Sequence, residues 1–176
     1  MPPIRYTALG MLGLALAGCA TIEHLPTERV GSATLQLASG VPAGTAQLLG
    51  SGTELNVTIA LAGLAPGVHG VHLHMVGSCE GPAFASAGGH LNPHGRQHGS
   101  DNPAGAHLGD LPNVTIGAGG TGTVSAALSD MRAEALAAIF DSDGTAVVVH
   151  AQPDDYRTDP SGASGDRVAC GVFRRS

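Results

Sequence analysis

Histidine dominates the chemistry that this sequence could support. The 176 residues include nine His but no Lys. His72 and His74 lie two positions apart in the segment 67–75, which has the alternating pattern of a β-strand. Side chains two positions apart on a strand share one face, so these two imidazoles are spaced to bind one metal ion. The alternative is that both are solvent-exposed polar residues. This alternative is less favoured, because further histidines downstream could converge with them on one metal.

A third histidine in the same segment is expected to have a different role. By strand alternation His69 lies on the opposite face, together with the apolar residues Val71 and Leu73. A histidine among core residues needs hydrogen-bond partners. We therefore expect His69 to be a structural residue that supports the site rather than a metal ligand.

The Gly-, Pro- and His-rich segment 79–110 carries a second group of metal ligands. His90, His98, His107 and Asp110 together form a set of three imidazoles and one carboxylate. Four such ligands satisfy the tetrahedral coordination of structural zinc, which would fix a segment without strands of its own. His94 lies near this set and is expected to be a solvated loop residue.

The pair His72 and His74 needs further nitrogen ligands to complete its own site. His150 follows the apolar strand 146–149 and is the candidate for this role. Sites rich in imidazole and near-planar in geometry suit Cu(II). The sequence therefore predicts two cofactors, one copper and one zinc ion per chain.

Short strands separated by Gly-rich turns must position these ligands. The expected strands are 43–49, 54–61, 67–75, 113–116, 122–128, 146–150 and 167–173, and the one expected helix is 130–140. This pattern predicts an all-β fold, an antiparallel sandwich or barrel of about eight strands. The segments 79–110 and 152–166 are long loops, which in a compact domain are usually functional.

The N-terminal segment has the pattern of an export signal. An apolar run over 8–17 precedes Leu16-Ala17-Gly18-Cys19, which resembles the lipobox of bacterial lipoproteins. We expect a signal peptide over 1–18, a tether over 19–30 and one folded domain over 31–176. Cys19 would carry the lipid and provide the only membrane attachment. The alternative is an ordinary secretory signal cut near Ala20.

Once Cys19 is modified by lipid, only Cys79 and Cys170 remain. In an exported protein such a pair predicts one disulfide, although two unrelated buried thiols are the alternative. The closed loop of about 90 residues would contribute about 4–5 kcal/mol to stability in the chain-entropy model.

Composition and charge exclude two broad classes of protein. A net charge of −6, with no Trp, two Tyr and three Phe, argues against binding of nucleic acid. A hydrophobic share of 43% with 12% charged residues excludes a disordered chain.

Several motifs resemble those of the bacterial periplasmic copper/zinc superoxide dismutases, over about residues 31–173. The segment 67–74, Gly-Val-His-Gly-Val-His-Leu-His, resembles the GxHGxHxH signature of that family. The segment 88–93 resembles the one that carries its bridging histidine, and the spacing of His98, His107 and Asp110 is similar to that of its zinc ligands. The segments around His150 and 165–171 resemble its last two signatures.

The resemblance implies a role for each matching residue. Copper would be bound by His72, His74, His90 and His150, and zinc by His90, His98, His107 and Asp110. His90 would bridge the two metals and take part in catalysis. Asp154 would hydrogen-bond one copper and one zinc histidine, Cys79 and Cys170 would form the disulfide, and Arg167 would attract the anionic substrate beside the open copper face.

The resemblance also implies the function and the place of action. The expected reaction is dismutation of superoxide to O₂ and hydrogen peroxide by alternating Cu(II) and Cu(I), on a Greek-key barrel lipid-anchored in the bacterial cell envelope, in the periplasm. One alternative is a copper-binding or copper-buffering lipoprotein without turnover, and another is a sandwich that metals only stabilise. For Arg167 the alternative is a surface salt bridge. The sequence leaves monomer and homodimer both open.

Overall fold

The fold is built almost entirely from antiparallel strands, as expected. The structure is a computed structural model that describes Met1 and residues 27–176. Its strands are β1 (Glu28–Leu37), β2 (Pro42–Ser51), β3 (Glu54–Ala62), β4 (Gly67–His69), β5 (Val71–His74), β6 (Val114–Ile116), β7 (Thr121–Ala127), β8 (Ala146–His150), β9 (Arg167–Val172) and β10 (Arg174–Arg175). The helical elements within the described residues are α1 (Arg132–Ile139) and one 3₁₀ turn, Ala85–Ala87.

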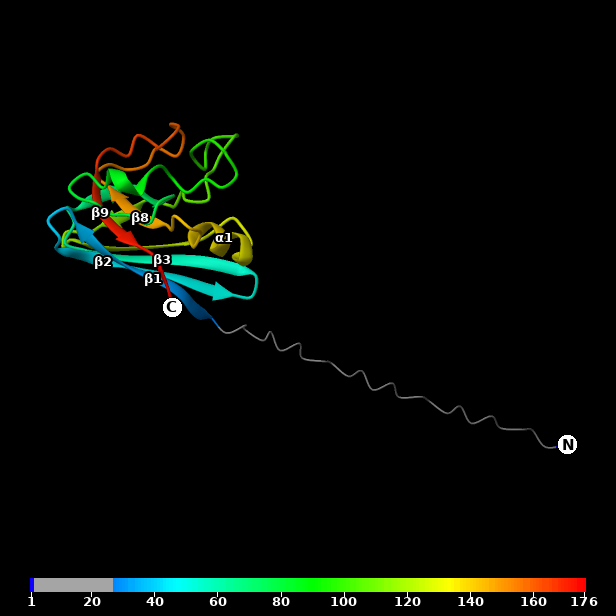
Figure 1. The fold of residues 1–176 in the computed structure, drawn as a ribbon. Helices are drawn as coiled ribbons and strands as arrows, with labels where there is room; N and C mark the ends of the chain where they lie inside the picture. The colour runs from blue at the N-terminus through cyan, green and yellow to red at the C-terminus, as the bar shows by residue number, and fades with distance from the viewer. Residues whose placement is uncertain (2–26) are drawn as a thin grey trace.

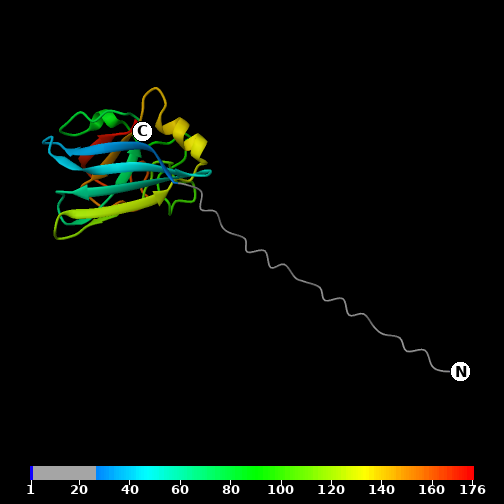
Figure 2. The ribbon, with the colours of Figure 1, turned by 90° about the horizontal axis from the view of Figure 1, so that it is seen from below.

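The order of the strands is that of a Greek key rather than a simple meander. The main sheet runs β5-β8-β9-β1-β2-β3-β7, with β10 paired to β1, while β4 and β6 form a small second sheet. Figure 1 shows β1, β2 and β3 as one layer, with β8 and β9 above it in that view, and Figure 2 shows the long strands side by side. The long loops project together beyond one side of this curled sheet. The predicted all-β antiparallel class is therefore confirmed.

The hairpin of β2 and β3 shows how the alternating sequence produces the core. Leu55, Val57, Ile59 and Leu61 of β3 are all buried, as the period of two requires for one face of a strand. The register pairs Ser51 with Glu54, so the connection is a two-residue turn. Gly52 within that turn has φ 56°, a conformation that glycine adopts without steric cost.

The segment 67–75 is not one strand, which corrects the expectation. It divides at Gly70 into β4, which pairs with β6, and β5, which pairs with β8. Gly70 N donates to Gln152 O, and Gly70 O accepts from His150 N. A Cβ on Gly70 would lie 2.8 Å from Ser164 Oγ. The chain changes sheets at a residue that has no space for a side chain, and the alternation of apolar residues continues across the break.

The helix is shorter than the expected 130–140. Ala135 and Ile139 are buried as the pattern predicts. Met131, which the pattern also placed on the inner side, is 58% exposed. It has extended backbone angles at the N-cap position, so the helical period does not yet apply to it.

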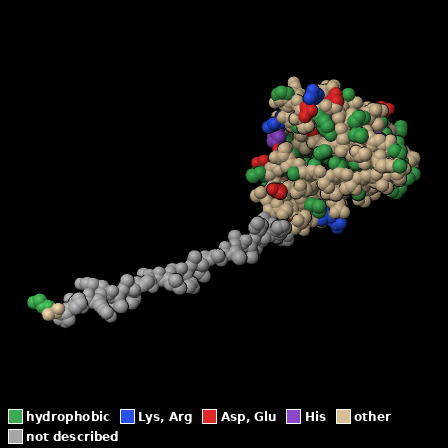
Figure 3. Space-filling view, turned by 180° about the vertical axis from the view of Figure 1, so that it is seen from behind, with side chains coloured by type: hydrophobic (Ala, Val, Ile, Leu, Met, Phe, Trp, Pro, Cys, Tyr) green, Lys and Arg blue, Asp and Glu red, His purple; other side chains and the backbone are tan. Residues whose placement is uncertain are grey.

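The described part of the domain begins slightly before the expected boundary. Glu28 pairs with Gly50, so 28–30 form the start of β1 rather than part of a tether. The expected signal peptide, the lipidation site Cys19 and most of the expected tether lie outside the described residues. Within the described residues, no helix is long and apolar enough to span a membrane. On the face shown in Figure 3, acidic and basic side chains are scattered rather than gathered into a basic patch.

Candidate metal centre

Four histidines from β5, β8 and the first long loop converge at one place. One ring nitrogen from each of His72, His74, His90 and His150 lies within 4.8 Å of the others. His72 and His74 are 0% and 1% exposed, so they are not the solvent-exposed polar residues of the alternative interpretation. A bridge between His74 and His90 holds the loop against β5. Strand pairing therefore brings together residues that are far apart in the sequence.

The unused ring nitrogens of His72 and His90 indicate a metal site. His72 Nδ1 and His90 Nε2 are buried and have no hydrogen-bond partner. The other nitrogen of each ring is engaged, His72 Nε2 with Asp154 Oδ2 at 2.8 Å and His90 Nδ1 with Asp110 Oδ1 at 2.9 Å. Buried polar atoms without partners are rare in native proteins. A copper ion bound by these two nitrogens would satisfy both.

His74 and His150 complete the same group in the same manner. Their Nδ1 atoms donate to main-chain carbonyls, to Gly88 O at 2.9 Å and to Gly165 O at 3.2 Å. Their Nε2 atoms are 3.4 Å apart and face each other. Backbone hydrogen bonds of this kind fix the tautomer and leave Nε2 as the metal ligand. The group thus fits copper with four imidazole nitrogens.

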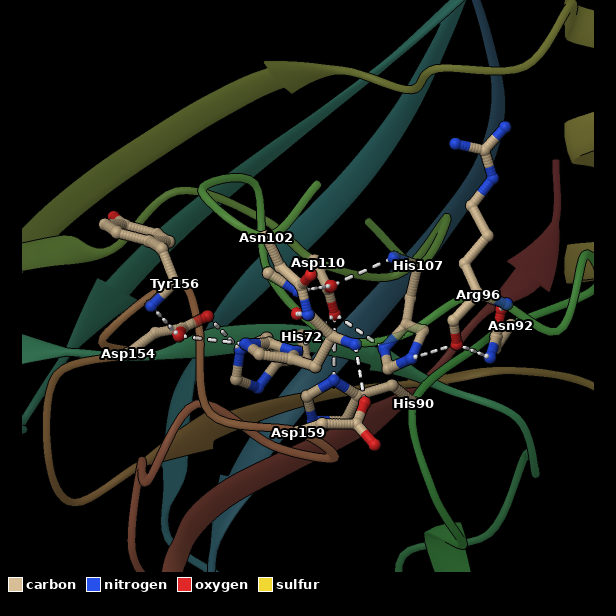
Figure 4. Close-up of polar contacts among 12 residues, drawn as sticks. His72, His90, Asn92, Arg96, Asn102, His107, Asp110, Asp154, Tyr156 and Asp159 are labelled. Atoms are coloured by element: carbon tan, nitrogen blue, oxygen red, sulfur yellow. Dashed lines mark hydrogen bonds and ion pairs between the residues drawn. The ribbon is translucent and has the colours of Figure 1, made fainter. Parts of the chain in front are cut away.

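The second group surrounds one carboxylate oxygen. Asp110 Oδ1 lies 2.9, 3.0 and 3.1 Å from the Nδ1 atoms of His90, His98 and His107 (Figure 4). Bonds of 2.0–2.1 Å in a tetrahedral zinc site separate the ligand atoms by about 3.3 Å. The observed separations are within a few tenths of an ångström of that value, so this set fits zinc.

Distance alone also places His72 near this second group. The hydrogen bonds show which of the two, His72 or His107, fits as the fourth ligand of this group. His72 Nε2 is bonded to Asp154, whereas His107 Nδ1 faces Asp110 Oδ1. His107 therefore fits as the fourth member of the zinc set, and His72 fits the copper set.

Asp154 joins the two groups from the side opposite His90. Its Oδ2 accepts from His72 Nε2 at 2.8 Å, and its Oδ1 accepts from His98 Nε2 at 3.0 Å. Asn113 holds the main chain of Asp154 in place, donating from Nδ2 to Asp154 O and accepting from Asp154 N. The sequence did not single out Asn113 for this role. The only local feature of the sequence that marks Asn113 is its position between Pro112 and the short strand β6.

Two loop glycines that the sequence analysis missed also support the ligands. Gly99 N donates to Asp110 Oδ2 at 2.9 Å. Gly162 has φ +64°, and a Cβ there would collide with Asp154 Oδ1. Glycine is common in loops of this composition, so no spacing distinguished these two positions.

Burial sets the protonation of the copper-side histidines. It is the largest cause that lowers the pKa of His90 to about 4 and the pKa of His150 to about 3. The pKa of His74 is lowered for the same first reason, to about 2. These rings are therefore neutral at neutral pH, so each offers one lone pair to a metal without losing a proton, and only His90 must give up its remaining proton if both of its nitrogens bind metals.

The carboxylates have the opposite effect on the zinc side. Burial would lower the pKa of His98, but hydrogen bonds to Asp110 and Asp154 raise it to about 9. Burial would raise the pKa of Asp110 and of Asp154, but their histidine hydrogen bonds lower both below the usual range. Two anionic carboxylates thus favour positive charge at this point, as a divalent cation would provide.

Arg167 is held beside the copper group by the main chain. Its Nη1 donates to Phe84 O at 2.7 Å and its Nη2 to Gly88 O at 2.6 Å. Gly88 O is also the acceptor for His74 Nδ1. Both of these hydrogen bonds go to carbonyl groups rather than carboxylates, so the positive charge is not neutralised by an ion pair with them.

The predicted disulfide is confirmed. Cys79 and Cys170 are bonded, with a Cα–Cα distance of 5.7 Å. The bond fastens the beginning of the first long loop to β9. The same loop carries Phe84 and Gly88, the two acceptors of Arg167.

His69 and His94 lie outside both groups. His69 is buried, with Nδ1 2.7 Å from His150 O and Nε2 3.0 Å from Ala65 O. It thus supports the backbone of a copper-set residue. His94 is exposed, as expected of a loop residue, but it bonds to Asp130 at 2.8 Å.

The fold and the site define a class of protein: an antiparallel barrel with two adjacent groups of candidate metal ligands, with His90 a member of both. The family model for copper/zinc superoxide dismutase matches residues 43–173. The chain belongs to the copper/zinc superoxide dismutase family.

Relatives and solved structures agree with this placement. A superoxide dismutase [Cu-Zn] of Caulobacter vibrioides is 38% identical over 175 residues, covering 97% of this chain and 99% of the relative. One of Deinococcus radiodurans is 37% identical, covering 93% and 92%. A double mutant of a SOD-like protein from Bacillus subtilis has a crystal structure with 40% identity and a TM-score of 0.71, covering 80% of this chain and 95% of that one.

Proposed function

We propose that this protein catalyses the dismutation of superoxide, with copper as the redox metal and zinc as the structural one. Two superoxide anions and two protons yield one O₂ and one hydrogen peroxide. The observation that carries the proposal is the convergence of four imidazoles, with buried unpartnered nitrogens, beside a guanidinium that main-chain carbonyls hold.

Each ligand is assigned by the nitrogen that its hydrogen bonds leave free. Copper would be held by His72 Nδ1 and by Nε2 of His74, His90 and His150. Zinc would be held by Asp110 Oδ1 and by Nδ1 of His90, His98 and His107. When bound, copper supplies one-electron chemistry by alternating between Cu(II) and Cu(I), whereas zinc has no redox chemistry.

The residues of the chain bind the substrate and move a proton. The Arg167 guanidinium attracts the superoxide anion to the copper side, where the charge of the whole chain, −6, would repel it. Local focusing by a fixed charge can raise association rates by about 10–10³. In the half of the cycle in which His90 Nε2 does not bind copper it could hold a proton, and it would donate that proton to the reduced substrate in the other half. Asp154 keeps His72 and His98 oriented throughout.

A copper-buffering protein without turnover is not favoured by these residues. Copper storage requires neither a second, tetrahedral ligand set nor a cation at the entrance. A purely structural role for both metals likewise does not account for a positive charge beside the copper group.

For the N-terminal segment we propose a lipoprotein signal peptide over 1–18, a lipid on Cys19 and a short tether before the domain. The support is the sequence Leu16-Ala17-Gly18-Cys19 together with the disulfide, which requires an oxidising compartment. We accordingly place the domain in the periplasm, attached to a membrane through the lipid. Metabolic labelling with a fatty acid, compared between the parent and Cys19→Ala, tests this directly.

The catalytic proposal is tested by superoxide dismutation with metal-replete protein, repeated after removal of copper alone. We expect activity that disappears with copper and returns when copper is restored. Metal analysis should find one copper and one zinc per chain. Full copper occupancy without activity would favour the buffering alternative instead.

A further inference from the structure

The zinc set has a second, polar approach from solvent, and it passes His94. A cavity of about 420 Å³ lies between the first long loop, the end of β7 and the start of α1. His107 and Asp110 line it, so two of the four proposed zinc ligands form part of its wall. The other two, His90 and His98, are not among its lining residues.

The same cavity presents side chains that bind divalent cations. His94, Asp130 and Glu134 line it, and none of them belongs to either metal set. His94 Nε2 lies 2.8 Å from Asp130 Oδ2, so an imidazole nitrogen and a carboxylate oxygen, two atom types that bind zinc, lie close together. The His94 side chain is 47% exposed and that of Asp130 12%, so this pair lies where the cavity meets solvent.

The charge within the cavity favours a cation. Three carboxylates line it, those of Asp110, Asp130 and Glu134, against one guanidinium, that of Arg96. The Arg96 side chain points away from His107 and Asp110 in Figure 4, and its Nη1 donates to Gly105 O. By contrast, a smaller cavity that also reaches Asp110 is lined by Ser100, Leu111, Pro112 and Tyr156, with no other side chain that prefers divalent cations.

We propose that His94 and Asp130 form an entry site that captures zinc from solvent and passes it to His107 and Asp110. This inference rests on the proposed zinc ligands. An entry site lies on the path in both directions, so it accelerates uptake and release by the same factor. The equilibrium affinity of the final site is then unaffected by its loss.

The test measures zinc uptake by the apo protein and zinc release to a chromophoric chelator, without reference to catalysis. His94→Gln retains a hydrogen-bond donor toward Asp130 but removes the ring nitrogen, and Asp130→Asn removes the charge. We expect each variant to slow both uptake and release about tenfold, the lower end of what local electrostatic focusing provides. The zinc dissociation constant should remain within about twofold of the parent. Asp143→Asn, which removes an exposed carboxylate on the loop between α1 and β8, should change neither rate.

Three outcomes would overturn the entry site. Unchanged rates in His94→Gln would mean that His94 only fastens the loop to Asp130. Faster uptake would mean that the pair obstructs the cavity. A weaker equilibrium affinity with faster release would make the pair part of the final site. If the parent itself fails to bind one zinc, the ligand assignment fails instead, and the two failures are thus distinguishable.

Discussion

Substitution of Arg167 is the most direct test of how the substrate is captured, because it changes the positive charge beside the copper group. Replacement by Ile removes the cation while retaining an apolar side chain of moderate size. Arg167 Nη2 lies 2.6 Å from Gly88 O, and His74 Nδ1 lies 2.9 Å from the same oxygen. The guanidinium nitrogen and that ring nitrogen are therefore at most about 5.5 Å apart, so an anion at the copper side would experience a nearby unit charge.

The geometry gives a magnitude for the loss. Two unit charges about 5 Å apart attract by about 1 kcal/mol in water and by about 3 kcal/mol at an effective dielectric constant near 20. Since 1.4 kcal/mol is a factor of ten, Arg167→Ile should lower the second-order rate constant by about 5- to 150-fold. Arg167→Lys should lose less, because it keeps the charge but not the fork that reaches both carbonyls. Arg167→Glu should lose most, because repulsion replaces attraction.

The assay is the second-order rate of superoxide decay over a range of ionic strengths. The rate constant of the parent should fall as the salt concentration rises. This salt dependence should be weaker in Arg167→Lys and weaker again in Arg167→Ile. The copper absorption spectrum serves as the control, since Gly88 O also accepts from His74, a copper-set residue. Equal losses in all three variants, with the salt response of the parent, would refute steering by Arg167.

Three further substitutions test the supporting residues. His69→Ala should lower the free energy of unfolding by about 2 kcal/mol, because the buried carbonyl of His150 loses its hydrogen-bond partner, while copper stoichiometry is retained; loss of copper at unchanged Tm would contradict this. Asp110→Ala should leave copper bound but abolish the rise in Tm that zinc gives the parent, because a ligand that binds only the native state stabilises it; a zinc-dependent rise that persists in the variant would count against the assignment. Asp154→Asn should weaken the affinity for both metals by about 10- to 100-fold, as measured by chelator competition, and an effect on one metal alone would show that Asp154 does not serve both groups.

Strand alternation and residue type were enough to predict much of the fold and most members of the two groups, whereas the place of His90 in the copper group followed only from the family resemblance. The strand β3 could be predicted from its alternating sequence, because one of its faces is buried and the other is not. The division of 67–75 at Gly70 could not be predicted, because the alternation is continuous and the residues that surround Gly70, Gln152 and Ser164, lie far along the chain.

The assignment of individual ring nitrogens also lay beyond the sequence. Whether Nδ1 or Nε2 of His72 is free depends on Asp154, which lies 82 positions away. Similarly, the role of Gly162 follows from its closeness to Asp154 in space and not from any local pattern. Spacing identifies which residues can be ligands, but only the assembled loops determine which atom of each residue faces the metal.

Two junctions connect the metal groups, His90 on one side and Asp154 on the other, and this has a thermodynamic consequence. Any factor by which bound zinc raises the affinity for copper must equal the factor by which bound copper raises the affinity for zinc. Where that factor exceeds one, a chelator that removes one ion also weakens the binding of the second. Under the same condition, the supply of a scarce metal governs how long the protein retains the other.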